Sequence, residues 1–203
     1  SKKDNNKRQL NLTKSNEVNS MHGIDDLKSI SVLRKKSTLK KIISSLIGKE
    51  YKNFGSELFA KPAGQGMPVP IHQDNKYWCL NDGNAVTVWF ALEKSNKKNG
   101  GIFYYCKSHL FGLFEHTPSF APGSSQKVKY AEGLEIFKKT TPSLLPGDCL
   151  IHSCLVLHGS NANKSANSRK GLTLRFKSKK SKIDKKLQKS YEEELSNQIK
   201  KKN

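Results

Sequence analysis

The sequence contains no apolar run that approaches the roughly 18 to 20 consecutive apolar residues of a membrane span. Its first residues are mostly polar or charged and no apolar segment follows them, so no secretory signal peptide is expected. The chain starts at Ser1 without a Met, which leaves open whether other segments precede it. From these absences we expect a protein of the cytoplasm that makes no membrane contacts.

Acidic residues are also scarce: 17 Asp and Glu stand against 37 Lys and Arg, which gives a formal net charge of +20. A surplus of this size can indicate a nucleic-acid or anionic-surface partner. Much of it lies in two Lys-rich ends, residues 1–20 and 177–203, whose Lys runs have no regular interleaving of aromatic residues on which bases could stack. We therefore expect solvated ends and no nucleic-acid partner.

Only four cysteines are present, and no two of them form a CxxC pair. Paired cysteines at that spacing are typical of zinc knuckles and redox dithiols, so neither kind of site is predicted. Most of the four lie in apolar, strand-like runs, which predicts buried free thiols in a reducing compartment. The four are Cys79, Cys106, Cys149 and Cys154.

The sequence does contain a helical segment followed by many short strands. Residues 24–48 carry apolar side chains at near-helical spacing, which predicts two short helices that end at Gly48. Later runs are rich in β-branched and aromatic residues and are separated by marked turns. These strands are expected at residues 54–60, 86–92, 102–106, 149–157 and 172–176. The pattern predicts a mainly β jelly-roll or barrel with N-terminal helices packed on one side.

We expect three parts along the chain. Residues 1–20 are polar and predict a flexible lead-in, and residues 21–177 form the β domain. Within that domain residues 107–141 are weakly patterned and rich in Gly, Pro and Ser, which is typical of a surface loop or a lid. Residues 178–203 predict a charged C-terminal helix or tail.

His72 and Asp74 stand in a strand-like run and are separated by one residue. Residues i and i+2 of a strand point to the same face, which would place the imidazole beside the carboxylate. Two histidines and one carboxylate on one face of Fe(II) leave open positions for a co-substrate and dioxygen. The pair alone is weak evidence, because a turn-capping Asp beside a partly buried His gives the same pattern.

A third ligand is offered by His158, which closes the apolar run 149–157 and is followed by Gly159 and Ser160. Arg169 lies eleven residues further on. Its planar guanidinium can pair bidentately with the distal carboxylate of a dicarboxylic co-substrate and stays charged. The second half of the sequence thus strengthens the interpretation of the His-x-Asp pair.

Two rivals share a strand face with these candidates if the strands are regular. His152 precedes His158 by six residues and competes as the metal ligand. Arg175 follows Arg169 by six residues and competes as the carboxylate anchor. Spacing to the downstream Gly-Ser pair and arginine favours His158, and Arg175 stays open as an anchor.

Several sequence blocks follow one another in order between about residues 57 and 176. The blocks are Glu57–Pro62 (ELFAKP), Pro68–Trp78 (PVPIHQDNKYW), Ala85–Leu92 (AVTVWFAL), Asn99–Ile102 (NGGI), Leu145–Asp148 (LPGD) and Leu157–Ser160 (LHGS), with Arg169 downstream. In this combination the chain resembles the phytanoyl-CoA dioxygenase family of Fe(II)- and 2-oxoglutarate-dependent oxygenases. The resemblance implies a double-stranded β-helix, that is a cupin-like jelly-roll, with iron near one mouth of the barrel.

The resemblance also implies roles for individual residues. It assigns His72, Asp74 and His158 to the metal and to catalysis. It assigns Arg169 to the C5 carboxylate of 2-oxoglutarate. Related halogenases replace the carboxylate ligand with a small residue, so the presence of Asp74 favours hydroxylation.

Further positions of the resemblance lie around the co-substrate and the substrate. Ser160 is an expected helper of the carboxylate anchor. Lys61, Thr87 and Trp89 match positions that line the co-substrate or substrate pocket. Tyr77 and Trp78 could form a substrate wall, although ordinary core aromatics would look the same.

Together these features predict a dioxygenase that hydroxylates an unactivated C–H bond of a small, anionic or zwitterionic metabolite and releases succinate and CO2. The implied cofactors are Fe(II), 2-oxoglutarate and O2, and the protein is expected to be a monomer or homodimer. One alternative is a cupin-like metal-binding protein without oxygenase activity. The other is a nucleic-acid demethylase of the same superfamily, which the basic charge favours slightly.

Overall fold

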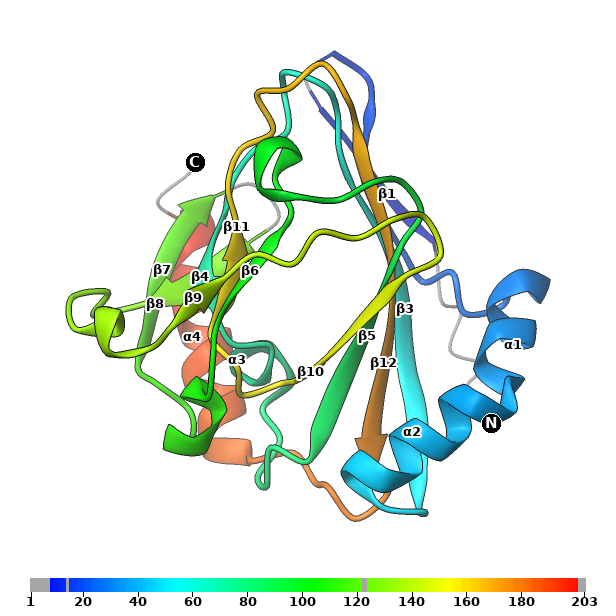
Figure 1. Ribbon diagram of the computed structural model, residues 1–203. Helices are drawn as coiled ribbons and strands as arrows, with labels where there is room; N and C mark the ends of the chain where they lie inside the picture. Colours follow the sequence, from blue (N-terminus) through cyan, green and yellow to red (C-terminus); the bar gives the residue numbers. More distant parts are fainter. Residues whose placement is uncertain (1–7, 14, 122–123, 201–203) are drawn as a thin grey trace.

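Two antiparallel sheets face each other in the computed structural model, which describes residues 8–13, 15–121 and 124–200 (Figure 1). The larger sheet has the strand order β1-β2-β3-β12-β5-β10, the smaller has the order β4-β11-β6-β9, and β7 and β8 form a separate hairpin. The elements in chain order are β1 (Gln9–Leu12), β2 (Val18–His22), α1 (Lys28–Lys35), α2 (Ser37–Ile47), β3 (Tyr51–Lys61), β4 (Val69–His72), α3 (Asn75–Trp78), β5 (Ala85–Ala91), η1 (Lys97–Asn99), β6 (Ile102–Tyr105), η2 (Ser108–Phe111), β7 (His116–Ala121), β8 (Ser124–Val128), η3 (Leu134–Ile136), β9 (Lys139–Thr140), β10 (Cys149–Ser153), β11 (His158–Ser160), β12 (Arg169–Ser178) and α4 (Lys185–Lys200).

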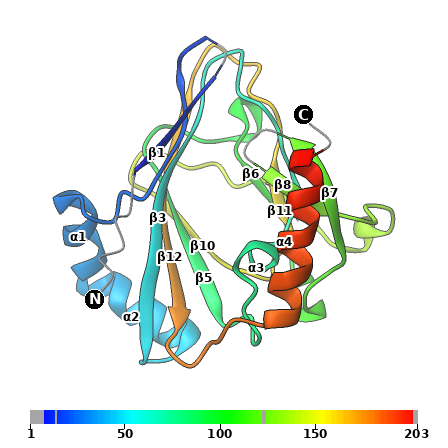
Figure 2. The ribbon, with the colours of Figure 1, turned by 180° about the vertical axis from the view of Figure 1, so that it is seen from behind.

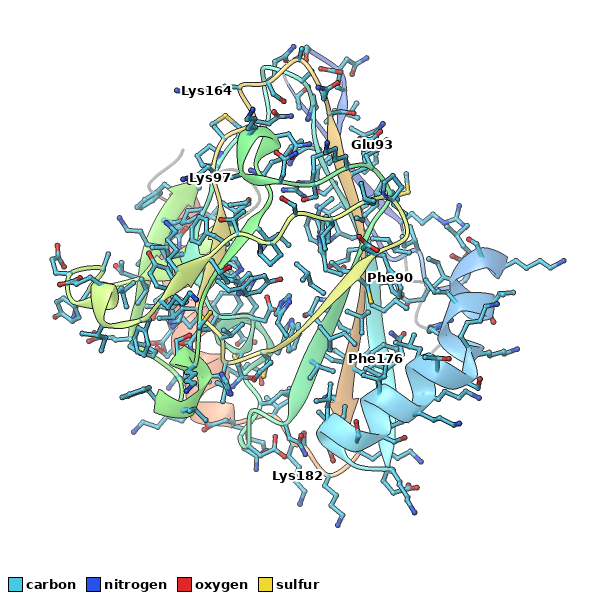
Figure 3. All side chains as sticks on the ribbon, viewed as in Figure 1. Phe90, Glu93, Lys97, Lys164, Phe176 and Lys182 are labelled. Atoms are coloured by element: carbon cyan, nitrogen blue, oxygen red, sulfur yellow. The ribbon has the colours of Figure 1, made fainter. Side chains whose placement is uncertain are left out.

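The larger sheet separates an apolar layer from the cavity between the sheets. Val88 of β5 and Leu174 of β12 are fully buried on its outer face, in one cluster with Ile43 of α2. Figure 3 shows Phe176 on the same side of the sheet, toward α2. Because side chains alternate along a strand, the residues between them, such as Thr87 and others of β5 and β12, point to the opposite face and line the cavity.

The C-terminal helix covers the other side of the molecule. Figure 2 shows α4 lying along the β7–β8 hairpin and α3, with both of which it is in contact. The expected charged helix within residues 178–203 is therefore present as α4, and residues 201–203 lie outside the described part. Among the described helices none is both long enough and apolar enough to cross a membrane.

The N-terminal segment differs from the expected flexible lead-in. Within residues 1–20, β1 and the start of β2 form a hairpin, and β2 pairs with β3 at the edge of the larger sheet. Residues 1–7 and 14 lie outside the described residues. The hairpin is mostly polar and exposed on much of its surface, so its sequence has no long apolar run that would indicate a buried strand.

Two internal segments also differ from expectation. The apolar run 149–157 is not one strand: it forms β10 and then turns into β11, so that it passes from the larger sheet to the smaller one. The stretch 107–141 is not a structureless loop, since its described residues contain the β7–β8 hairpin, two short helices and β9. In neither segment did the local composition indicate where the chain turns.

Candidate metal centre and its cavity

Three side chains converge at the inner end of the smaller sheet. His158 of β11 pairs directly with His72 of β4, so the two imidazoles lie side by side. One ligand atom from each of these residues and from Asp74 lies within 4.8 Å of the others. The Nε2 atoms of His72 and His158 are 3.8 and 3.6 Å from Asp74 Oδ1.

The expected neighbourhood of His72 and Asp74 is present, but its geometric origin is different. β4 ends at His72, and Asp74 begins the short helix α3 with helical backbone angles. The helical turn, rather than strand alternation, brings the carboxylate back beside the imidazole. Gln73 between them points away and is held by Gly112 O and, through its carbonyl, by the N–H of Phe114.

Both imidazoles are oriented for metal binding. His72 Nδ1 donates to Pro70 O at 2.8 Å, and His158 Nδ1 donates to Val156 O at 3.0 Å. Because each Nδ1 carries the proton, each Nε2 presents a lone pair toward Asp74. A backbone acceptor on the far ring nitrogen is the usual support of a metal-bound histidine.

The protonation states also suit a divalent metal. Burial lowers the pKa of His72, and burial with the neighbouring His72 lowers the pKa of His158 to about 3. Burial alone would raise the pKa of Asp74, but the surrounding imidazoles, His158 first, hold it well below its usual range. The site is therefore two neutral imidazoles and one carboxylate, which is the ligand set of non-haem Fe(II).

The second oxygen of Asp74 is tied to the larger sheet. Thr87 Oγ1 donates to Asp74 Oδ2 at 2.7 Å, and His152 Nε2 lies 3.4 Å from the same oxygen. His152 also hydrogen-bonds through Nδ1 to the hydroxyl of Tyr104 at 3.1 Å. His152 reaches the centre from β10 and not from the strand of His158, so it lies behind the carboxylate rather than replacing His158.

Two buried cations lie further along the same cavity. Arg169 of β12 is opposite Lys61 of β3 in the strand register, and both residues are 3% exposed. Arg169 donates to Gly100 O, while its Nε has no partner within residues 8–13, 15–121 and 124–200. Lys61 donates to the backbone carbonyls of Met67 and Asn161.

Burial and the adjacent Arg169 lower the pKa of Lys61 to about 7, and burial lowers the pKa of Arg169 to about 10. Among the described residues no carboxylate lies within ion-pair distance of either cation. An uncompensated pair of buried cations is costly, so this end of the cavity fits an anionic ligand.

Gly171 of β12 leaves room for the ring of Trp89, which forms part of the cavity wall. A Cβ on Gly171 would lie 2.0 Å from the ring of Trp89, which pairs across the strand with Thr173. Glycine therefore lets the indole lie flat on β12, where Arg169 covers it at 5.4 Å from the ring centre. The guanidinium is fixed between this ring and the Gly100 carbonyl.

One cavity of about 310 Å³ connects the metal ligands with the buried cations. All the residues singled out in the sequence line it. They are Lys61, His72, Asp74, Tyr77, Trp78, Thr87, Trp89, His158, Ser160, Arg169 and the rival pair His152 and Arg175.

Sequence reasoning missed two groups near this cavity. Tyr104 of β6 contacts the imidazole of His152, and His22 of β2 and Glu57 of β3 form part of the cavity wall. No local signal in the sequence distinguishes His22. Its position depends on the pairing of β2 with β3, which the polar sequence of β2 does not reveal.

The fold and the site together define a class: a cupin-like double-stranded β-helix with a facial set of two histidines and one carboxylate. The model of the phytanoyl-CoA dioxygenase (PhyH) family matches residues 1–171. The chain belongs to this family.

Curated relatives support the assignment. A probable phytanoyl-CoA dioxygenase of Caenorhabditis elegans is 25% identical over 146 residues, which are 66% of this chain and 46% of the relative. The phytanoyl-CoA dioxygenase domain-containing protein 1 homolog of Dictyostelium discoideum is 33% identical over 116 residues, 55% of this chain and 41% of the relative. The chain thus spans about half the length of the curated relatives it matches.

Solved structures share the fold. EctD from S. alaskensis with bound Fe has a TM-score of 0.69 at 22% identity, over 83% of this chain and 60% of EctD. The non-heme alpha ketoglutarate dependent carbocyclase SnoK has a TM-score of 0.69 at 20% identity, over 87% of this chain and 71% of SnoK. These similarities confirm the predicted mainly β, jelly-roll fold class.

Proposed function

We propose that the protein is an Fe(II)- and 2-oxoglutarate-dependent dioxygenase that hydroxylates a C–H bond of a small molecule. The observation that carries the proposal is the pairing, in one cavity, of the facial His72/Asp74/His158 set with two buried cations that have no counter-ion among the described residues. A metal chelator with a distal carboxylate matches both ends of that cavity. EctD has been solved with Fe and with 2-oxoglutarate, which supports the same assignment.

Each residue has a defined part in this proposal. His72, Asp74 and His158 would hold the iron, and bound Fe(II) would supply the activation of dioxygen. Arg169 would pair with the C5 carboxylate of 2-oxoglutarate. Lys61 adds a second positive charge there, and Thr87 fixes the free oxygen of Asp74 so that Oδ1 faces the two imidazoles.

Other residues help that end of the cavity and shape the space for substrate. Ser160, fully enclosed on β11, lines the cavity and can donate a hydrogen bond to the same carboxylate. Tyr77 packs edge-on against His72 at 5.7 Å, and Trp78 follows it on α3. These aromatic rings form an apolar wall beside the metal ligands and keep water away from them.

The size of the cavity restricts the substrate. Its volume of about 310 Å³ is at the lower end of the roughly 300–1,000 Å³ of small-molecule pockets. Because 2-oxoglutarate must share this space, we infer a small metabolite rather than the enclosed binding of a long acyl-CoA chain. The cytoplasmic location and the monomeric or homodimeric state stay predictions.

Anaerobic titration with Fe(II) and 2-oxoglutarate tests the proposal through the visible metal-to-ligand charge-transfer band. The wild-type protein should form the band, and His158→Ala should not. Arg169→Gln should bind iron normally but bind 2-oxoglutarate about tenfold or more weakly, since a charge-assisted bidentate pair is lost.

The matched control is Lys170→Gln, which removes the neighbouring positive charge on the outer face of β12, where Lys170 pairs with Glu93. It should leave both affinities unchanged. An undiminished band in His158→Ala would contradict the proposal. Iron binding without a band in the wild type would favour the cupin-like alternative without oxygenase activity.

A further inference from the structure

We propose that Arg175 binds a carboxylate of the substrate, which makes the substrate a small carboxylate-bearing molecule. The inference rests on the proposed function for the nature of the reaction, but its observations are separate from the metal ligands. They concern a polar cluster on the cavity wall, formed by Arg175, Glu57 and His22. No part of the proposed reaction with 2-oxoglutarate uses this cluster.

The two arginines of β12 lie at opposite ends of one inward-facing row. Six residues separate Arg169 from Arg175, which is roughly 20 Å along a strand. Arg175 is directly opposite Thr87 of β5, the residue that donates to Asp74. Arg175 is therefore at the level of the metal ligands, whereas Arg169 lies at the far end with Lys61.

The neighbouring strand β3 leaves space for the side chain of Arg175. Gly55 of β3 is its partner in the register, and a Cβ there would lie 2.1 Å from Arg175 Nη2. The guanidinium occupies the space that any other residue would fill. Phe54 and Trp78 lie beneath it, with ring centres 5.5 and 5.9 Å from its central carbon.

Hydrogen bonding in the cluster is incomplete on the donor side. Glu57 Oε1 already faces two groups, His22 Nδ1 at 2.8 Å and Arg175 Nη2 at 3.2 Å. Arg175 Nε is buried and has no partner in the described part of the chain. A guanidinium can donate five hydrogen bonds in a planar fork, so Arg175 retains donors for an additional acceptor.

The free hydrogen-bond donors of Arg175 determine which class of ligand fits. A planar anion that accepts two hydrogen bonds fits the free part of the fork, and a carboxylate does so with a single negative charge. An ammonium group would instead need Glu57, whose nearer oxygen is already engaged by two neighbours. The contrast with Arg169, which has no carboxylate within ion-pair distance in the described chain, assigns 2-oxoglutarate to Arg169 and the substrate to Arg175.

The test uses the full chain with Fe(II) and saturating 2-oxoglutarate under anaerobic conditions. The probes are valerate, valeramide and pentylamine, which differ only in the head group, together with propyl phosphate. Binding is followed through the perturbation of the charge-transfer band. Valerate should bind most tightly, and Arg175→Gln should weaken it about tenfold or more, while Arg175→Lys, which keeps the charge and loses the fork, gives an intermediate value.

Glu57→Gln distinguishes a binding site from a structural ion pair. Removing the internal carboxylate frees the guanidinium, so this variant should bind valerate more tightly than wild type. If the pair only stabilised the fold, both single variants would weaken binding in parallel, and the inference would be wrong. Tighter binding of pentylamine or propyl phosphate than of valerate would also overturn it, as would loss of the 2-oxoglutarate band in Arg175→Gln.

Failure of the proposed function can be told apart from failure of this inference. Calorimetry on metal-free Arg169→Gln protein removes the competing carboxylate anchor and needs no band. Valerate should bind to this protein, and adding Arg175→Gln should abolish the heat. Lys170→Gln serves as the control at an outward position of β12 and should change nothing, and urea unfolding midpoints establish that each variant is folded.

Discussion

Lys61 and Arg169 illustrate how burial sets the charge of single residues in this protein. They face each other across β3 and β12 with little solvent access. Water cannot screen the repulsion there, so burial and the adjacent guanidinium bring the pKa of Lys61 down to about 7. A lysine that titrates near neutrality makes ligand binding depend on pH in a defined direction.

We expect binding of 2-oxoglutarate to take up a proton at pH 8 and almost none at pH 6. In the free protein Lys61, with its pKa of about 7, is mostly neutral at the higher pH, and the arriving carboxylate raises that pKa again. Calorimetry in two buffers of different ionisation enthalpy measures the uptake. Lys61→Met should abolish it, and equal uptake in that variant would assign the proton to another group.

The same shift affects the free protein without ligand. The pKa of Lys61 is 10.5 in its ordinary state and about 7 in the folded protein. Between pH 7 and pH 10.5 the unfolded chain therefore binds more protons than the folded one. Its contribution to the free energy of unfolding therefore rises as pH increases through that window. Lys61→Met should flatten this part of the stability profile.

Individual site residues differ in how far the sequence could predict them. His72, Asp74, His158 and Arg169 stand in distinctive local patterns, and the fold brings all four to one cavity. The sequence could not show that a helical turn, rather than a strand, places the carboxylate. Glu57 heads the block Glu57–Pro62, but its role could not be predicted, because it depends on neighbours from β2 and β12 that are distant in the sequence.

At the scale of elements, α4 supports the metal-bearing turn from outside. Lys76 of α3 pairs with Glu194 of α4 at 3.0 Å, and the Lys76 side chain is only 6% exposed. Tyr77 and Tyr191 pack edge-to-face at 5.8 Å, and Gln198 donates to Ser125 O of β8. The C-terminal helix therefore holds together α3 and the hairpin inserted before η3.

Glu194→Gln should reduce the free energy of unfolding by about 1–3 kcal/mol, because it leaves the largely buried ammonium of Lys76 uncompensated. Urea unfolding measures the change. Glu193→Gln is the matched control: its pair with Lys189 is exposed on both sides, at 3.9 Å, and should be worth less than about 0.5 kcal/mol.

The double variant Lys76→Met/Glu194→Leu should recover most of the loss, because an apolar pair can replace a buried ion pair. A loss of equal size in Glu194→Gln and Glu193→Gln would show that burial does not determine the effect.

Helices and strands could be predicted where the local periodicity is strong. They were missed where the partner strands determine the secondary structure. Residues 28–35 and 37–47 form the two helices expected from their apolar spacing, and β5 and β6 agree with their predicted strands to within a residue at each end. The end of β10 at Ser153 and the turn that precedes β11 were not predictable, because the run 149–157 is mostly apolar throughout. The turn arises because β10 pairs within the larger sheet and β11 within the smaller one.

At the scale of the whole molecule, the net charge of +20 acts against the compact state. Folding brings the positive charges closer together, and their mutual repulsion extends over a Debye length of about 10 Å at an ionic strength of about 0.1 M. The basic residues are spread over many elements, including the solvent-exposed side of α4. Salt should therefore stabilise this protein more than one of balanced charge.

We expect the free energy of unfolding to rise by about 1 kcal/mol when KCl increases from about 0.02 M to about 0.3 M, because screening weakens this repulsion. Urea unfolding at each salt concentration measures it. A variant with four exposed α4 lysines replaced by Glu should show a smaller rise, and an unchanged slope would contradict the explanation. The four are Lys185, Lys186, Lys189 and Lys200.

The metal ligands are divided between the two halves of the sandwich. His72 and His158 belong to the smaller sheet, while the carboxylate of Asp74 is anchored by Thr87 of the larger one. An ion bound by all three residues would link the two sheets to each other at the cavity between them. Binding of iron would then stabilise the contact between the two sheets, so loading with Fe(II) should raise the free energy of unfolding.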